Sequence, residues 1–177
     1  IKVLTLFAFS TENWQRSKKE INLLMSLVQR GLKQNLKKFA KEGIKLRIIG
    51  QRERLPKTIQ DFLKEAEELT QNNQAMTLNI ALSYGGRAEI TGAIKSIIEK
   101  KIPPEKITEE IVSKNLWTSD LDLLIRTGKE QRLSNFLIWQ AAYSELYFCP
   151  EYWPDFDEKD LDNALADYAK RQRRRGR

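Results

Sequence analysis

Short apolar runs alternate with amphipathic helical patterns along the whole sequence. Mostly apolar runs lie at residues 3–9, 121–125 and 146–148, and apolar residues alternate with polar ones at residues 44–48 and 76–82. Apolar residues at helical spacing mark residues 17–43, 56–69, 86–98, 108–116, 136–143 and 161–168. Alternating strands and helices are typical of a mostly parallel sheet with helices on both faces. We therefore predict a single α/β domain over residues 1–177, without an internal repeat or a linker.

The first strand and helix carry the most specific local signals. Residues 3–9 are apolar apart from Thr5, which is typical of a strand buried on both faces. Ser17 followed by Glu20 is a capping box, which predicts that a long helix begins there, and Gly43 predicts its end. The polar residues 10–16 between them form a loop at the carboxyl end of the strand.

The composition excludes several kinds of site. The chain has 177 residues, of which 41% are hydrophobic, and none of its apolar runs is long enough to span a membrane. It has no histidine, which rules out a Ser-His-Asp triad, a histidine general base and a histidine-ligated metal. A bound metal would therefore take oxygen ligands. The one cysteine, Cys149, excludes a disulfide within the chain and suits a reducing, cytoplasmic environment.

The net charge of +7 is concentrated at the C-terminus. Six of the last eight residues are basic, which leaves 7 − 6 = +1 for the rest of the chain. A solvated helix end favoured by the helix macrodipole explains this tail, and a patch for nucleic acid or acidic lipid is the alternative. A nucleic-acid-binding module would spread its basic residues over a face with aromatics, so we expect no nucleic-acid partner.

Arginines follow four of the predicted strands. They are Arg16, Arg52, Arg87 and Arg126. The carboxyl ends of parallel strands meet at one edge of a sheet, where ligands of open α/β folds bind. This placement favours an anionic substrate such as a phosphate or diphosphate. The sequence has neither a Walker loop nor GxGxxG, which argues against nucleotide hydrolysis and a dinucleotide cofactor.

The stretch from Arg126 to Phe148 concentrates the polar signals. Arg126 ends the apolar run 121–125, and Arg132 and Ser134 precede the helical pattern at 136–143. Two guanidinium groups, a hydroxyl and the amides of a helix start would together form a phosphate site. The alternative is that both arginines pair with acidic residues on a solvated face.

Five motifs occur in an order that resembles the cis-prenyltransferase family. They are FSTENW, YGGR, RTGxEQRLSNFLxWQ, YxELYF and WPDFD, and the match runs from Val3 to the end of the chain. Within that family, the bacterial undecaprenyl diphosphate synthases are the most similar. The resemblance implies a six-stranded parallel sheet, a homodimer, Mg²⁺ and a location in the cytoplasm with peripheral membrane contact for product release. It also implies head-to-tail condensation of isopentenyl diphosphate onto an allylic diphosphate such as farnesyl diphosphate, with cis double bonds. The product would be undecaprenyl diphosphate, a lipid carrier for cell-wall synthesis.

The resemblance assigns the polar loop after the first strand to substrate binding. Its matching residues are Ser10, Thr11, Glu12, Asn13, Trp14 and Arg16. An amide does not titrate usefully, so Asn13 would position isopentenyl diphosphate or the departing diphosphate that takes up the proton. Trp14 would lie against the allylic substrate, although a plain core aromatic is the alternative.

The resemblance also assigns the later motifs. Arg126, Arg132, Leu133 and Ser134 match the clamp for isopentenyl diphosphate, in which Arg126 also serves catalysis. Glu145 matches a carboxylate near the metal, although it could be an ordinary acid at the end of a helix. Glu20 and Asp155 match further family positions.

Two more assignments concern the product and the partner subunit. Arg174 and Gly176 match an Arg-x-Gly ending that reaches the neighbouring subunit's diphosphate site. A product channel would be lined by apolar residues of the long helix and the third strand. The candidates are Leu24, Met25, Val28, Leu32, Met76, Leu78 and Ile80, and the alternative is that all of them are ordinary core.

Some features depart from the family pattern. Nothing in the sequence matches the family's MDGNxRWA motif, whose aspartate binds the metal. We therefore expect that the family's first strand, loop and helix are not included in these 177 residues, and a genuinely shortened protein is the alternative. Lys129 stands where glycine is usual, Ser17 where proline is usual, and the loop at residues 118–120 looks short. A non-catalytic or short-chain member of the fold therefore remains an alternative, and the motifs do not fix the product length.

Overall fold

The structure is a computed structural model that describes residues 1–172. The chain forms two compact units, Ile1–Glu89 and Ile90–Arg177, each of which is described by itself. The predicted Arg174 and Gly176 lie outside the described residues.

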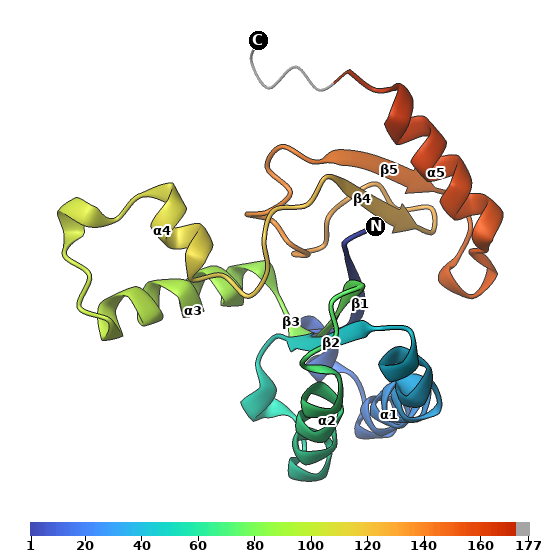
Figure 1. Ribbon diagram of the computed structural model, residues 1–177, viewed down its shortest axis with the longest axis horizontal. Coiled ribbons are helices and arrows are strands. Elements are labelled where there is room, and N and C mark those ends of the chain that lie inside the picture. Colours follow the sequence, from blue (N-terminus) through green and yellow to red (C-terminus); the bar gives the residue numbers. More distant parts are fainter. Residues whose placement is uncertain (173–177) are drawn as a thin grey trace. The chain divides into compact units, whose positions relative to one another are not determined.

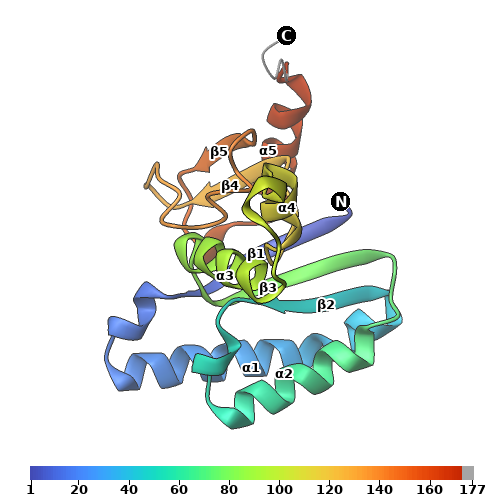
Figure 2. The same cartoon turned by 90° about the vertical axis from the view of Figure 1, so that its left-hand side faces the viewer.

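The first unit is a three-stranded parallel sheet with two helices on one face. Its strands β1 (Val3–Ser10), β2 (Ile44–Ile49) and β3 (Met76–Tyr84) lie in the order β1-β3-β2. Helices α1 (Lys18–Lys41) and α2 (Lys57–Thr70) lie side by side against this sheet (Figure 2). Because the side chains of a strand alternate between faces, one face of each strand supplies the core beneath these helices.

One apolar cluster fills the space between the sheet and the two helices. Leu46 of β2 pairs with Leu78 of β3, and both pack with Leu32 of α1 and Leu63 of α2. Removing a buried leucine of this kind typically costs about 2–5 kcal/mol of unfolding free energy. The cluster therefore fixes the position of the strand ends that carry the polar loops.

β1 differs from the expected strand buried on both faces. It is an edge strand in the described sheet, with Val3 and Leu4 exposed and Phe9 buried. The central strand is β3, although it carries the polar residues Asn79 and Ser83, both fully buried. The apolar content of residues 3–9 therefore overstated the burial of β1. The polar side chains of β3 can be buried because they bond within the sheet and to the loop beside it.

Within the described residues, the second unit holds the parallel strands β4 (Leu123–Thr127) and β5 (Glu145–Cys149) and the helices α3 (Gly86–Glu99), α4 (Glu109–Lys114) and α5 (Glu158–Lys170). Figure 1 shows these elements. The two strands pair so that Arg126 lies beside Phe148. Helix α5 packs against β5. Helix α3 begins at the end of the first unit, and α4 follows it along the chain. The α/β class and the parallel strand pairing are confirmed.

Two expectations were wrong: the helix at residues 136–143 and the number of strands. Residues 136–143 form turns instead of a helix, because Ser134, Asn135 and Leu137 have φ values of 49°, 62° and 45°. Left-handed backbone at these positions does not start a right-handed helix. The described residues form five strands instead of the six implied by the resemblance.

None of the helices within residues 1–172 combines the length and the apolar character needed to cross a membrane.

Candidate functional site

The loop after β1 is held by reciprocal hydrogen bonds. The backbone N–H of Ser10 donates to Oδ1 of Asn13 at 2.9 Å, and the N–H of Asn13 donates to Oγ of Ser10 at 3.3 Å. The N–H of Thr11 donates to the carbonyl of Tyr84 at 2.8 Å, which ties the loop to the end of β3. Because Oδ1 of Asn13 is occupied by the loop, its NH₂ group is the part of the amide suited to donate to a ligand.

Trp14 lies between three neighbours from different parts of the first unit. Its ring packs edge-on against Phe9, with centroids 5.0 Å apart, and the guanidinium of Arg54 lies 5.3 Å from the indole centroid. Its Nε1 donates to Oγ of Ser83 at 2.8 Å. A cation over an indole contributes about 0.5–1 kcal/mol at an exposed site. Trp14 is thus partly buried and held in one orientation.

The ends of β2 and β3 approach each other closely beside this loop. Gly50 has φ of 125°, and a Cβ placed there would lie 2.0 Å from the carbonyl oxygen of Leu82. Only glycine fits this position. Next to it, the N–H of Gln51 donates to the carbonyl of Ser83 at 3.1 Å, and Ser83 itself has φ of 50°. Sequence reasoning missed Ser83 and Arg54 as supports of Trp14, since neither lies in a matched motif.

The charged residues of the loop differ in their environments. Glu12 accepts a hydrogen bond from the Thr11 hydroxyl at 3.0 Å, and Arg16 is exposed. Glu20 completes the predicted capping box with Ser17, which is confirmed. The hydrogen bonds from Ser17 hold the pKa of Glu20 below its usual range.

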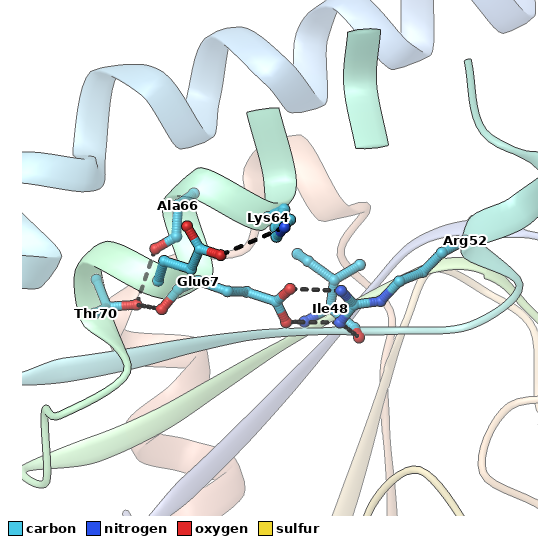
Figure 3. Close-up of polar contacts among 7 residues, drawn as sticks. Ile48, Arg52, Lys64, Ala66, Glu67 and Thr70 are labelled. Carbon is cyan, nitrogen blue, oxygen red and sulfur yellow. Dashed lines mark hydrogen bonds and ion pairs between the residues drawn. The ribbon is translucent and has the colours of Figure 1, made fainter. Parts of the chain in front are cut away.

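Arg52, one of the arginines expected to serve an anion site, is occupied within the protein (Figure 3). Its Nη1 lies 2.5 Å from Oε2 of Glu67 and its Nη2 lies 2.6 Å from Oε1 of the same carboxylate. Nη2 also donates to the carbonyl of Ile48. Glu67 therefore occupies the guanidinium of Arg52 that was expected to bind an anionic substrate.

The same network covers the outer edge of β2. The N–H of Ile48 donates to Glu67 at 2.7 Å, and the N–H of Leu46 donates to the Thr70 hydroxyl at 3.0 Å. The side chain of Asn73 donates to the carbonyl of Ile44 at 2.9 Å. Side chains thus satisfy backbone groups that an exposed edge strand would offer to another chain.

Arg126 is the candidate residue with an unsatisfied donor. It lies on β4, one residue before the strand ends. Its Nε is buried and has no hydrogen-bond partner within residues 1–172. A buried guanidinium nitrogen without a partner is costly, so it is a strong candidate for binding an anionic ligand.

The other clamp residues lie on the loop that follows β4. Arg132 is 63% exposed, and its Nη1 lies 2.6 Å from Oε2 of Glu130. Ser134 is exposed and Leu133 is half-buried. Since residues 136–143 are turns, the predicted helix start does not contribute amides here, and that part of the prediction was wrong. An exposed ion pair contributes about 0–1 kcal/mol, so Arg132 can exchange Glu130 for a ligand at little cost.

Glu145, the predicted metal ligand, begins β5 and has a basic partner. Its Oε2 lies 2.9 Å from Nη1 of Arg171, which also binds Asp167. These hydrogen bonds raise the pKa of Arg171. A carboxylate suits Mg²⁺ in its chemistry, but a magnesium ion needs several oxygen ligands in an octahedron. Glu145 alone does not complete such a site.

A separate group of metal-capable side chains lies nearby in the second unit. Cys149, Glu151 and Asp160 bring their ligand atoms within 4.8 Å of one another. Sγ of Cys149 donates to Glu151 at 2.9 Å, and burial raises the pKa of the thiol. A protonated sulfur is a poor partner for Mg²⁺. This group therefore does not supply the ligands that Glu145 lacks.

The predicted channel residues all belong to the apolar cluster of the first unit. Met25, Leu32, Leu78 and Ile80 are buried in it, and Leu24, Val28 and Met76 pack against it with partial exposure. The structure confirms that all seven residues lie in or against one cluster. Whether they line a product channel or form ordinary core stays a prediction. Asp155 is exposed in a short turn of helix, Trp153–Asp155.

Comparison with known proteins assigns the chain to a class. A family model described as "Putative undecaprenyl diphosphate synthase" matches residues 1–176, so the chain belongs to this family of prenyltransferases. The resemblance, the fold class and the enzyme class expected from the motifs are confirmed.

Individual relatives are similar over almost the whole chain. The ditrans,polycis-undecaprenyl-diphosphate synthase of Pasteurella multocida, specific for (2E,6E)-farnesyl diphosphate, is 47% identical over 99% of this chain and 76% of its own length. An isoprenyl transferase of Agrobacterium fabrum is 48% identical over 99% of this chain and 74% of its own.

Solved structures share the fold. The crystal structure of a "probable undecaprenyl diphosphate synthase" from Campylobacter jejuni has a TM-score of 0.94 and 40% identity, and the match covers 100% of this chain and 84% of that one. Lavandulyl diphosphate synthase from Lavandula x intermedia, in complex with dimethylallyl diphosphate, also has a TM-score of 0.94 and 40% identity, covering 100% of this chain and 80% of that one.

Proposed function

We propose that this chain condenses isopentenyl diphosphate onto an allylic diphosphate and forms a cis double bond at each addition. In each cycle a carbon–carbon bond joins the two substrates, the carbon–oxygen bond of the allylic diphosphate breaks, and isopentenyl diphosphate loses one proton. Farnesyl diphosphate is the proposed starter and undecaprenyl diphosphate the proposed product. The similarity to a farnesyl-specific synthase supports both choices.

The observation that carries this proposal is the buried Nε of Arg126, which has no hydrogen-bond partner among residues 1–172. A diphosphate oxygen would satisfy it and form a bidentate pair with the guanidinium. Arg132 and the hydroxyl of Ser134 complete the clamp for isopentenyl diphosphate, with Leu133 between them. Arg132 would leave Glu130 when the substrate binds.

The loop after β1 would orient the reacting groups. The NH₂ of Asn13 donates to a diphosphate oxygen, while its Oδ1 stays bound to the N–H of Ser10. The departing diphosphate, not Asn13, takes up the proton. Trp14 lies against the allylic substrate, and Ser10, Thr11, Glu12 and Arg16 line the same loop.

Enzymes of this family generally use metal ions. Mg²⁺ is the proposed ion, because the diphosphates are hard oxygen ligands. Glu145 would offer it one oxygen, and the ion would neutralise negative charge on the departing diphosphate.

The growing prenyl chain is apolar and must be kept out of water during elongation. Burying each added five-carbon unit stabilises the bound chain by roughly 2–4 kcal/mol, at about 0.8 kcal/mol per CH₂ group. Leu24, Val28, Met76 and Leu78 are the proposed channel lining, and their shared cluster beneath the sheet supports this. A cytoplasmic homodimer with Arg174 and Gly176 reaching the neighbouring subunit rests on the motifs alone.

Product analysis tests the proposed function. The complete protein, supplied with Mg²⁺, farnesyl diphosphate and labelled isopentenyl diphosphate, should yield long products that chromatography resolves after dephosphorylation. Absence of any labelled prenyl product would contradict the proposal.

A short-chain activity is the second candidate, favoured by the equal structural similarity to lavandulyl diphosphate synthase. The same assay with dimethylallyl diphosphate as starter separates the two. A single condensation with this starter, and no elongation of farnesyl diphosphate, would establish the short-chain enzyme.

A further inference from the structure

The solvent face of α1 is strongly basic. The helix Lys18–Lys41 contains seven basic residues and one acidic residue, Glu20, so its net charge is 7 − 1 = +6. All seven basic side chains are exposed. Subtracting this helix and the six tail charges from the total leaves 7 − 6 − 6 = −5 for the rest of the chain. The positive charge of the folded chain is therefore segregated onto one helix and the tail.

These basic residues share one side of the helix. Lys19, Arg30, Lys33, Lys37 and Lys41 recur at helical spacing. The buried residues Met25 and Leu32 lie on the opposite side, in the apolar cluster that they share with residues of β2 and β3. Figure 2 shows α1 lying along the sheet. Within residues 1–172, the ion pair recorded for this helix is Lys38 with Glu42, at 3.9 Å. The other basic side chains of α1 are therefore exposed to solvent, with no ion pair to another part of residues 1–172.

Two leucines interrupt this basic face. Leu23 is 58% exposed and Leu27 is 49% exposed, and their i, i+4 spacing places them next to each other. Basic residues that flank exposed leucines on a helix are typical of helices that lie on an anionic membrane surface. Nucleic-acid surfaces instead interleave basic residues with aromatics, and α1 has one aromatic residue, Phe39, which packs against the core.

We propose that the outer face of α1 docks on anionic phospholipid bilayers, a binding surface defined by Lys19, Leu23, Leu27, Lys33 and Lys37. Lysines bind the lipid headgroups, and the two leucines enter the boundary between headgroups and acyl chains. This inference rests on the proposed function, because a long prenyl product must pass from protein to membrane. The opposite face of α1 carries the proposed channel residues Leu24 and Val28.

Vesicle flotation with the full chain tests this proposal. Vesicles of phosphatidylcholine are compared with vesicles containing about one third phosphatidylglycerol, in about 0.1 M salt. Lys33→Glu/Lys37→Glu should weaken partitioning to the anionic vesicles by about 25-fold or more, since each lysine contributes about five-fold. Leu23→Ser/Leu27→Ser should weaken it by about 10-fold.

Matched controls separate the helix face from overall charge. Lys95→Glu/Lys106→Glu makes the same charge change at exposed positions outside α1 and should bind as the wild type does. Unchanged binding of both α1 variants would overturn the proposal and assign any vesicle binding to another surface, such as the tail. Equal binding to neutral vesicles would overturn it as well. The proposal would also be overturned if the wild type bound an RNA oligonucleotide but no vesicles, and the lysine variant lost the RNA binding.

Turnover in detergent distinguishes this inference from the proposed function. The α1 variants should elongate farnesyl diphosphate in micelles at the wild-type rate, with an unchanged melting temperature. Full turnover without vesicle binding by the wild type would overturn the docking surface alone. Vesicle binding as expected, with no turnover in any form of the protein, would contradict the proposed function alone.

Discussion

The indole Nε1 of Trp14 donates a 2.8 Å hydrogen bond to the hydroxyl of Ser83, which lies 69 residues further along the chain. This bond joins the loop after β1 to the end of β3. Ser83 is fully buried with φ of 50°, so the indole rests on an unusual backbone conformation. The orientation of Trp14 therefore depends on a residue outside the loop that carries it.

A double-mutant cycle tests this relationship. Trp14→Phe removes the donor, Ser83→Ala removes the acceptor, and each should lower the free energy of unfolding by about 1–3 kcal/mol because a buried polar group is left unpaired or lost. Urea unfolding of both variants and the double variant should give a coupling energy of about 1 kcal/mol. Additive effects would show that the bond does not hold Trp14.

The edge of β2 gives a second prediction. Glu67→Ala leaves the N–H of Ile48 and the guanidinium of Arg52 without their carboxylate, so we expect a loss of about 2–4 kcal/mol in unfolding free energy. Glu68→Ala, at an exposed pair with Lys64 whose closest atoms are 3.8 Å apart, is the matched control and should cost less than about 1 kcal/mol. Similar losses in the two variants, measured by denaturant unfolding, would contradict the role of Glu67 in covering the edge.

The capping box of α1 predicts a pH dependence. Ser17 lowers the pKa of Glu20 below its usual 4.5, so the stability that this carboxylate contributes is present above 4.5 and is lost as the pH falls through the lowered value. Ser17→Ala should lower the melting temperature at neutral pH and reduce the decline on acidification. If the melting temperatures of the wild type and the variant fell equally as the pH was lowered through this window, the capping box would not be a source of acid sensitivity.

The proposed channel makes a prediction about product length. Leu78→Ala should shift products to longer chains or a broader distribution, and Met76→Trp should shorten them, because the two changes enlarge and narrow the space beneath the sheet. Leu63→Ala, a core position on α2 outside the proposed lining, is the control for general destabilisation. Chromatography of the dephosphorylated products is the readout, and an unchanged distribution in both stable variants would make these positions ordinary core.

Local signals in the sequence predicted local structure well. Ser17 and Glu20 form the expected capping box, and Met76, Leu78 and Ile80 face one cluster as their alternation indicated. Both features depend on residues close together in the chain. They can therefore be read without knowing the tertiary contacts.

Features that depend on backbone conformation or distant partners were missed. Apolar residues at 136–143 are spaced like a helix, but left-handed backbone at Asn135 and Leu137 prevents one. Arg52 was expected at an anion site because it follows a strand, whereas Glu67, 15 residues further on, binds it. The basic face of α1 was missed because acidic residues elsewhere offset its +6, which leaves a net charge of only 7 − 6 = +1 outside the tail.

The central claim is that Arg126 holds the diphosphate of isopentenyl diphosphate. Isothermal titration of the complete protein with this substrate tests it most directly, using Arg126→Lys to keep the charge and lose the bidentate guanidinium. Arg30→Lys, an exposed position on α1, is the matched control. We predict that Arg126→Lys weakens binding about 10-fold or more, as expected for a charged hydrogen bond of about 1.5–3 kcal/mol, while Arg30→Lys binds as the wild type does. An unchanged dissociation constant in a folded Arg126→Lys protein would contradict the assignment.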